Sequence, residues 1–291
     1  MTAATADVSV APHVEAAKAR LDDAVSQHGA GVLAYSGGKE SSVLLHLCQP
    51  YPEVAAIWVN GGDAFPHVES FIREATQDRN FLELQGDLAA SIRDFGYPAD
   101  LIPVAGSFWG IDGDPLPASP IPLQPWTSCC ARVRMAPLFR YIANVGATLF
   151  IHGQRSDLEP GFTAESGPDA IVDICAPLRD WSEADVMAYV ADNDIELPSH
   201  YPEVMDSLDC MGCTAIAGDG GQARQARYRY MAREYPEAFE RVASVMAVSS
   251  MAALATCEEV VADAKLAAAT YRETKGVAFN ETRDVADAQC A

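Results

Sequence analysis

Residues 31–49 read GVLAYSGGKESSVLLHLCQ, and this stretch decides the fold. The apolar run at 31–36 is typical of a buried strand, and residues 40–49 have the composition of the helix that follows it. Gly37 and Gly38 stand between the strand end and the helix start. We therefore expect a strand–loop–helix unit here.

The same alternation continues along the chain. Residues 13–28, before the first strand, have apolar residues at the spacing of a helix. Downstream of that strand, apolar runs alternate with amphipathic segments. Strands are predicted at 31–36, 54–59, 81–84, 147–152 and 170–178, helices at 40–49, 67–79, 88–95, 131–143 and 182–193, and a loop at 102–128. Alternating strands and helices indicate an α/β fold with a mostly parallel, doubly wound sheet covered on both faces. From residue 221 onward the pattern is mostly helical, and no second sheet domain is expected.

Length and charge restrict the class of protein. The chain has 291 residues, 49% of them hydrophobic, with 41 acidic against 20 basic side chains and a formal net charge of −21. Such a charge repels a polyanion, so direct nucleic-acid binding is not expected. No run reaches the roughly 18 apolar residues of a membrane helix, and we expect a cytoplasmic protein without a signal peptide. Whether it forms a homo-oligomer stays open.

One local cluster departs from the acidic balance. Arg224, Arg227, Arg229 and Arg233 follow a glycine-rich turn. They read either as a site for a small anion or as one solvated helix face.

The segment Ser36-Gly37-Gly38-Lys39-Glu40-Ser41 has the chemistry of a phosphate loop. Two glycines let the backbone approach an anion, and the next helix directs its N-terminal amides toward it. Ser36, Lys39 and Ser41 add side-chain donors. A tight strand-to-helix turn without a ligand is the other interpretation, and the segment lacks the Gly-x-x-x-x-Gly-Lys spacing of a Walker A loop.

Two cysteine pairs form the second constellation. Cys129-Cys130 and Cys210-Met211-Gly212-Cys213 lie about 80 residues apart, and four thiolates suit either a tetrahedral zinc ion or a four-iron cluster. The plain alternative is that Cys129 and Cys130 are small buried hydrophobic residues and that the spacing of Cys210 and Cys213 is fortuitous. Cys48, Cys175 and Cys257 lie in apolar or helical contexts and read as core positions.

Together these motifs resemble the sulfonucleotide reductases of the PP-loop adenine nucleotide alpha-hydrolase-like superfamily. The resemblance covers residues 15–235 and adds three segments to the loop and the cysteines: Val59 to Pro66, Gly153-Gln154-Arg155 and PLRDWSEADVMAYV at 177–190. Such enzymes reduce adenosine 5′-phosphosulfate (APS) or its 3′-phosphorylated form (PAPS). The cysteine set resembles the APS branch, whose four cysteines hold a [4Fe–4S] cluster.

The resemblance implies a role for each matching segment. Residues 1–235 would form the nucleotide-binding and Fe–S domain, and residues 236–291 a helical extension with a flexible tail. The cluster ligands would be Cys129, Cys130, Cys210 and Cys213, and the nucleotide would contact Ser36, Gly37, Gly38, Lys39, Glu40, Ser41, Asn60, Gly61, Gly62 and Arg155. Arg155 can bind two oxygens at once, or it pairs with Asp157 or Glu159 instead. Arg132 and Arg134 are further anion-binding candidates.

Three departures from the family pattern affect the expected reaction. The complete SGGKES loop is typical of relatives that cleave ATP, with Mg²⁺. Ser128 and Val133 stand where those reductases carry a lysine and an arginine. The C-terminal E-C-G-L-H of the family is absent, which leaves Cys290 as the candidate nucleophile or as an ordinary exposed thiol. Three hypotheses follow: a reductase that uses a thioredoxin-like donor, an ATP-dependent adenylating sulfur-transfer enzyme, and a non-catalytic Fe–S nucleotide-binding protein.

Overall fold

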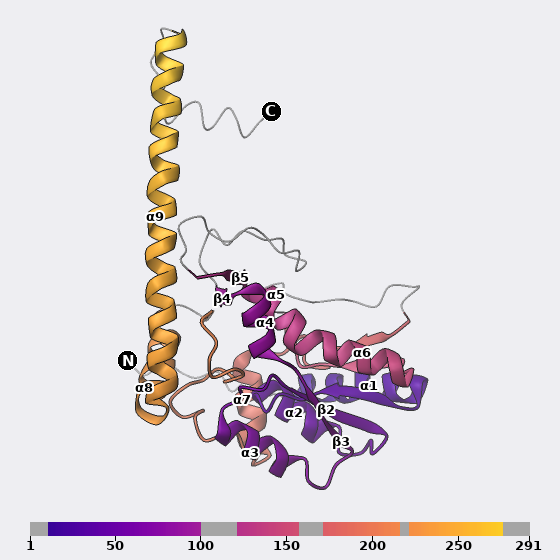
Figure 1. Cartoon of the computed structure of the whole chain (residues 1–291). Coiled ribbons are helices and arrows are strands. Elements are labelled where there is room, and N and C mark those ends of the chain that lie inside the picture. The colour runs from indigo at the N-terminus through magenta and orange to yellow at the C-terminus, as the bar shows by residue number, and fades with distance from the viewer. Residues whose placement is uncertain (1–10, 100–120, 157–170, 216–220, 276–291) are drawn as a thin grey trace, which may run out of the picture.

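A parallel sheet forms the centre of the molecule (Figure 1). The computed structural model describes residues 11–99, 121–156, 171–215 and 221–275. Within them, the main sheet has five strands in the order β3-β2-β1-β6-β7, and each neighbouring pair is parallel. The strands are β1 (Gly31–Ala34), β2 (Val54–Asn60), β3 (Phe81–Gln85), β6 (Leu149–Ile151) and β7 (Asp173–Cys175). The predicted α/β class is confirmed.

Helices cover both faces of this sheet. Because successive side chains of a strand point to opposite faces, Leu33 of β1 joins the core beneath one set of helices, whereas its neighbour Val32 packs in the core that includes Leu138 and Ile142 of α6. The first set comprises α1 (Ala11–His28), α2 (Lys39–Leu47), α3 (Pro66–Ala75) and α7 (Glu183–Asp192), and α6 (Ala136–Val145) lies on the other face.

The helix after the double cysteine differs from the prediction. Instead of one helix over 131–143, the structure has α5 (Trp126–Cys130), one π-helical turn (η1, Ala131–Met135) and then α6. Pro137 has no N–H to donate to the carbonyl of Val133, four residues earlier. The helical hydrogen bonds change from the i→i−4 to the i→i−5 pattern here, because the N–H of Ala136 donates to the carbonyl of Ala131. A widened turn therefore follows directly after Cys129 and Cys130.

A small second sheet was not expected from the sequence. β4 (Tyr97–Ala99) pairs in parallel with β5 (Leu123–Pro125), and α4 (Leu88–Phe95) leads into β4. The loop prediction for 102–128 is wrong at its end, since β5 and the start of α5 occupy residues 123–128. Residues 100–120 lie outside the described part of the chain.

Two helices complete the described chain, as the sequence predicts. α8 (Gly221–Glu234) packs against the start of α9 (Pro236–Lys275), and Met231 and Val242 join the main core. Figure 1 shows α9 as a long single helix that extends beyond the rest of the molecule. α9 begins at the proposed boundary after residue 235, and the division into two domains stays a prediction. In the described segments, no helix combines the length and the hydrophobicity needed to cross a bilayer.

Candidate functional site: two adjoining cavities at the carboxyl edge of the sheet

The strand order creates a natural binding position. Strands β2 and β3 lie on one side of β1, and β6 and β7 lie on the other. Connections therefore leave the carboxyl ends of β1 and β6 in different directions, and in open α/β sheets ligands bind at such a switch point. The loops that leave these ends are residues 35–38 and 152–155.

The phosphate loop is closed by its own hydroxyl groups. Gly37 has a φ of 74°, a conformation that favours glycine, and Gly38 is the N-cap of α2. The Ser41 hydroxyl donates to the Gly38 carbonyl (2.9 Å) and accepts from the Ser36 amide (3.2 Å). The loop therefore holds a fixed shape next to the N-terminus of α2, where an anion is favoured.

Lys39 of this loop and Arg155 beside it are buried, and each is paired with a carboxylate. The Lys39 ammonium donates to the carbonyl of Met205 (2.9 Å) and lies 3.1 Å from Glu183. The Arg155 guanidinium pairs with Glu40, and its side chain is 4% exposed. Gly153 allows the segment that carries Arg155 to lie against Glu40, because a Cβ at residue 153 would lie 2.9 Å from the Cβ of Glu40. Lys39 and Arg155 thus lie at the predicted site, each with a carboxylate partner.

A cavity of about 830 Å³ opens above this loop, and we call it the large cavity. Ser36, Gly38, Glu40 and Ser41 line it from the phosphate loop, and His152, Gly153 and Gln154 line it from the end of β6. Its apolar wall comes from Ile57, Val59 and Leu138. Its volume is within the range of small-molecule sites in proteins.

A second cavity of about 240 Å³, the cysteine cavity, adjoins the first. The two cysteine pairs, separated by about 80 residues, both line it: Cys129, Cys130, Cys210 and Cys213. The two cavities share a wall, because both are lined by Trp126, Cys130, Arg134, Ser207 and Asp209. The structure therefore brings the predicted phosphate loop and the predicted cluster ligands to neighbouring spaces.

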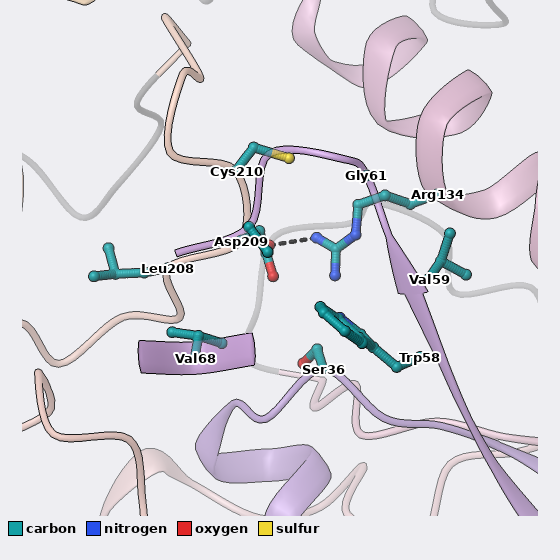
Figure 2. Close-up of a pocket in the computed structure, with 10 residues that line it drawn as sticks. Ser36, Trp58, Val59, Gly61, Val68, Arg134, Leu208, Asp209 and Cys210 are labelled. Atoms are coloured by element: carbon teal, nitrogen blue, oxygen red, sulfur yellow. Dashed lines mark ion pairs between the residues drawn. The ribbon is translucent and has the colours of Figure 1, made fainter. Parts of the chain in front are cut away.

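Arg134 lies in this shared wall and is paired. Figure 2 shows its guanidinium between Asp209 and Trp58, with Ser36 on one side and Cys210 on the other; the ion pair is with Asp209. Arg132 has a different environment: it donates to Gln124 Oε1 (2.7 Å) and covers the ring of Phe95 at 3.7 Å. Of the two predicted anion-binding arginines, only Arg134 lines the cavities described here.

Asp63 connects the nucleotide side to the cysteine motif. Its carboxylate accepts a hydrogen bond from the amide of Gly212 (2.5 Å), and its carbonyl accepts from the amide of Met211 (2.8 Å). Both amides belong to the turn between Cys210 and Cys213. Gly212 is needed for this contact, because a Cβ there would lie 2.7 Å from the Asp63 carboxylate.

The environment of the cysteine thiols favours the neutral form in the absence of a metal. Burial raises the pKa of Cys130 to about 12. It also raises the pKa values of Cys129 and Cys210. Binding of a metal centre would therefore release protons from these thiols.

The thiols do not converge on one point. Among the described residues, no three His, Cys, Asp or Glu side chains are arranged to hold a single metal ion. Arg227 also lines the cysteine cavity: it donates to the Cys210 carbonyl (3.1 Å), while its buried Nε finds no acceptor in the described segments. The cavity thus has four cysteine thiols and a buried N–H donor along its walls.

The remaining predicted site residues are in three different situations. Asn60 donates to Glu83 and accepts from the Gly62 amide, so it shapes the loop after β2. Gly61 lines the narrow cleft of Figure 2, which Arg134 and Cys210 also line. Cys290 lies outside the described residues.

Sequence reasoning did not assign roles to Asp209, Asp63 or Trp126. Asp209 directly precedes Cys210, and Asp63 belongs to the segment 59–66, so proximity to a motif was the available signal. The arginines of the cluster at residues 224–233 do not share one environment. Arg227 contacts the Cys210 carbonyl, whereas Arg233 pairs with Glu203 on the surface.

Residues 30–98 and 116–216 match the family model described as phosphoadenosine phosphosulfate reductase domain. These ranges contain the phosphate loop, all four cysteines and the carboxyl edge of the sheet. The chain belongs to this family.

Individual relatives match over shorter stretches. An adenosine 5′-phosphosulfate reductase from Burkholderia cepacia is 32% identical over 114 residues, 38% of this chain and 45% of that protein. One from Neisseria meningitidis serogroup A is 33% identical over 104 residues, 34% of this chain and 42% of that protein. The chain thus spans less than half the length of these relatives. The crystal structure of a phosphoadenylyl-sulfate (PAPS) reductase from Candida auris covers 68% of this chain and 92% of its own, with 14% identity and a TM-score of 0.44.

Replacing Asp63 by alanine is expected to lower the free energy of unfolding by about 1–2 kcal/mol, because the Gly212 amide loses a charged acceptor. Urea titration of the metal-free protein measures this. Asp63→Asn keeps an acceptor oxygen and serves as the matched control, with a smaller loss. Equal losses in the two variants would argue against the hydrogen bond as the source.

Proposed function

We propose that this protein is a sulfonucleotide reductase: it binds APS or PAPS in the large cavity, next to a [4Fe–4S] cluster in the cysteine cavity, and reduces the sulfonucleotide to sulfite. The observation that carries the proposal is the shared wall of the two cavities. Cys130 and Arg134 line both, so a ligand on the phosphate loop would lie beside the sulfur ligands.

The large cavity supports nucleotide binding by its two contrasting walls. The N-terminus of α2 and the Ser36 and Ser41 hydroxyls suit the phosphate, and the apolar wall suits a purine. The proposed contacts are those with Ser36 to Ser41, with Asn60 to Gly62 indirectly, and with the Arg155–Glu40 pair at the anionic end.

The cysteine cavity supports a cluster over a zinc ion. A structural zinc ion draws four ligands to within about 2.3 Å of one centre, whereas no three His, Cys, Asp or Glu side chains of the described residues are arranged to hold one ion. The four cysteines line, with other residues, a cavity of about 240 Å³. The proposed ligands are Cys129, Cys130, Cys210 and Cys213, and the buried Arg227 Nε–H would be available as a hydrogen-bond donor to such a group. Such a cluster would supply a polarising charge next to the substrate.

The proposed reaction begins with a thiolate, for which Cys290 is the candidate. Its sulfur bonds to the sulfate sulfur, the bond to the phosphate oxygen breaks, and adenosine monophosphate (or its 3′-phosphorylated form) leaves with the electron pair. An external dithiol of the thioredoxin type then attacks the Cys290 sulfur, releases sulfite and is oxidised to a disulfide. Arg134 in the shared wall is the proposed cation for the sulfate, once a ligand competes with Asp209.

One observation favours a second candidate, an ATP-dependent sulfur-transfer enzyme that adenylates its substrate. Glu40 and Asp209 both line the large cavity. Glu40 pairs with Arg155 and Asp209 pairs with Arg134, and carboxylates are the ligands that Mg²⁺ takes beside a nucleotide phosphate. These carboxylates and the complete SGGKES loop suit Mg²⁺–ATP better than a bare sulfate.

The test uses the full chain, purified anaerobically, with calorimetric titration of APS, PAPS and ATP. A reductase binds APS or PAPS most tightly, and mass spectrometry after incubation with it finds a thiosulfonate on Cys290. Preferential ATP binding with pyrophosphate release from ATP would instead establish the second candidate. Tight binding without turnover of either nucleotide would overturn both enzymatic proposals and leave a non-catalytic nucleotide-binding protein.

A further inference from the structure

The second half of α9 carries an exposed apolar face. Figure 1 shows this part of the helix extending away from the sheet. Among the described side chains of α9, Ser249 is the last that is buried. Beyond it, Leu254 is 61% exposed, Val261 is 51% exposed and Tyr271 is 48% exposed. Large apolar residues that gather on one exposed face mark an interaction surface.

This face repeats every seven residues. Spacings of three and four alternate along it without interruption, and no charged residue occurs at any of its positions. The six residues are Leu254, Cys257, Val261, Ala264, Ala268 and Tyr271. Such a pattern is that of positions a and d in the heptads of a coiled coil, where they form a seam along one side of the helix. We call these six residues the α9 seam. Its form suits a second helix.

The charges beside the α9 seam favour one direction for that second helix. Glu258 and Lys265 each follow a d residue, so they occupy position e, and both are exposed. The g positions, on the other side of the seam, are uncharged: Ala253, Val260, Ala267 and Thr274. In a parallel pair, position e faces position g of the other helix, and the two charges would find no partner. In an antiparallel pair, position e faces position e, and opposite charges can meet.

We propose that the α9 seam is a dimer interface, on which a second copy of this chain packs as an antiparallel coiled coil. Positions a then pack against positions d of the other copy, and the layers are Leu254 with the partner subunit's Tyr271, Cys257 with the partner subunit's Ala268, and Val261 with the partner subunit's Ala264. This register places Glu258 within about 3 Å, along the helix axis, of the height of the partner subunit's Lys265.

The symmetry of this arrangement explains why a copy of the same chain fits. A two-fold axis repeats every contact, so the pair of Glu258 with the partner subunit's Lys265 forms twice. The same sequence supplies both members of each layer and both charges of each pair. The dimer does not depend on the proposed reaction, because no residue of α9 lines the large cavity or the cysteine cavity.

Sedimentation velocity of the full chain at micromolar concentration tests the dimer. The wild type is expected at twice the 31.1 kDa mass of one chain. Val261→Asp places a charge in the seam of both copies and should raise the dimer dissociation constant at least about 100-fold. Leu266→Asp makes a similar change at position f, on the other side of the helix, where Leu266 is 66% exposed. This matched control should stay dimeric. A monomeric wild type, or equal effects of the two substitutions, would overturn the proposal.

A charge exchange tests whether the helices are antiparallel. Glu258→Lys should raise the dissociation constant about tenfold, because two attractive pairs become repulsive. Adding Lys265→Glu to the same chain restores opposite charges in both pairs and should return the affinity of the wild type. If the double variant is weakened by the sum of the two single effects, the two residues do not meet and the proposed register is wrong.

Disulfide trapping tests the register directly. Ala268→Cys should form an intermolecular disulfide with the partner subunit's Cys257 under mild oxidation, which mass spectrometry of the linked peptides identifies. Ala264→Cys is the matched control, because position 264 lies four residues along the axis from that layer and should not link to Cys257. A disulfide between the two Cys257 residues of a wild-type dimer would show parallel helices and would overturn the antiparallel arrangement.

Discussion

Replacing Cys130 by serine is expected to reduce the bound iron of the anaerobically purified protein from about four atoms per chain to nearly none. A serine oxygen is a harder ligand than a thiolate, and iron–sulfur clusters depend on thiolate ligands. Cys130 lines both cavities, so the same change also alters the wall that the nucleotide would contact. Iron and sulfide analysis, with the visible absorption that dithionite bleaches, measures the loss.

Cys257→Ser provides the matched control. It makes the same chemical change on α9 at a residue that does not line the cysteine cavity. The prediction of a core position for Cys257 is wrong, since this residue is exposed. The iron content of Cys257→Ser should equal that of the wild type. If Cys130→Ser keeps its iron, or if the wild type carries zinc in a one-to-one ratio instead, the proposed cluster is wrong. Neither outcome depends on enzymatic turnover.

Much of the fold follows from local patterns in the sequence. The run at 31–36, the two glycines and the helix after them predict β1, the phosphate loop and α2 to within a few residues, because a buried parallel strand is a short apolar run. The mostly parallel sheet follows from the alternation of strands and helices. The short β5 strand lacked such a signal, since only three residues separate Pro122 from Trp126.

The site was harder to predict, because its geometry depends on contacts between distant segments. The sequence indicated the four cysteines by their pairing, but their common cavity depends on how α5 meets the turn at 210–213. No spacing rule relates Arg134 to Asp209, or Asp63 to Gly212, although each pair is in contact. The structure pairs Arg155 with Glu40, 115 residues earlier. Asp157 and Glu159, the partners suggested by nearness in sequence, lie outside the described residues.

The widened turn after the double cysteine also creates a close contact with the loop after β3. Val133 lies in η1, and its carbonyl cannot receive a hydrogen bond from Pro137. This carbonyl faces Gly86: a Cβ at residue 86 would lie 2.1 Å from the Val133 oxygen. Gly86 in turn donates its amide to the carbonyl of Asn60 (2.7 Å). The contact therefore joins the loops after β2 and β3 to the segment that carries Cys129 and Cys130.

Replacing Gly86 by alanine should lower the free energy of unfolding by about 3 kcal/mol, because the clash is with backbone and no side-chain rotation relieves it. Gly29→Ala is the informative comparison. Gly29 has a φ of 71° and nothing within 4 Å of its Cβ position, so it should lose only about 1 kcal/mol from backbone strain. Urea unfolding of the metal-free proteins measures both. Because η1 must move in Gly86→Ala, its iron content should also fall, while that of Gly29→Ala should not. A Gly86→Ala protein with wild-type stability would show that Gly86 does not pack against the Val133 carbonyl of η1 as described.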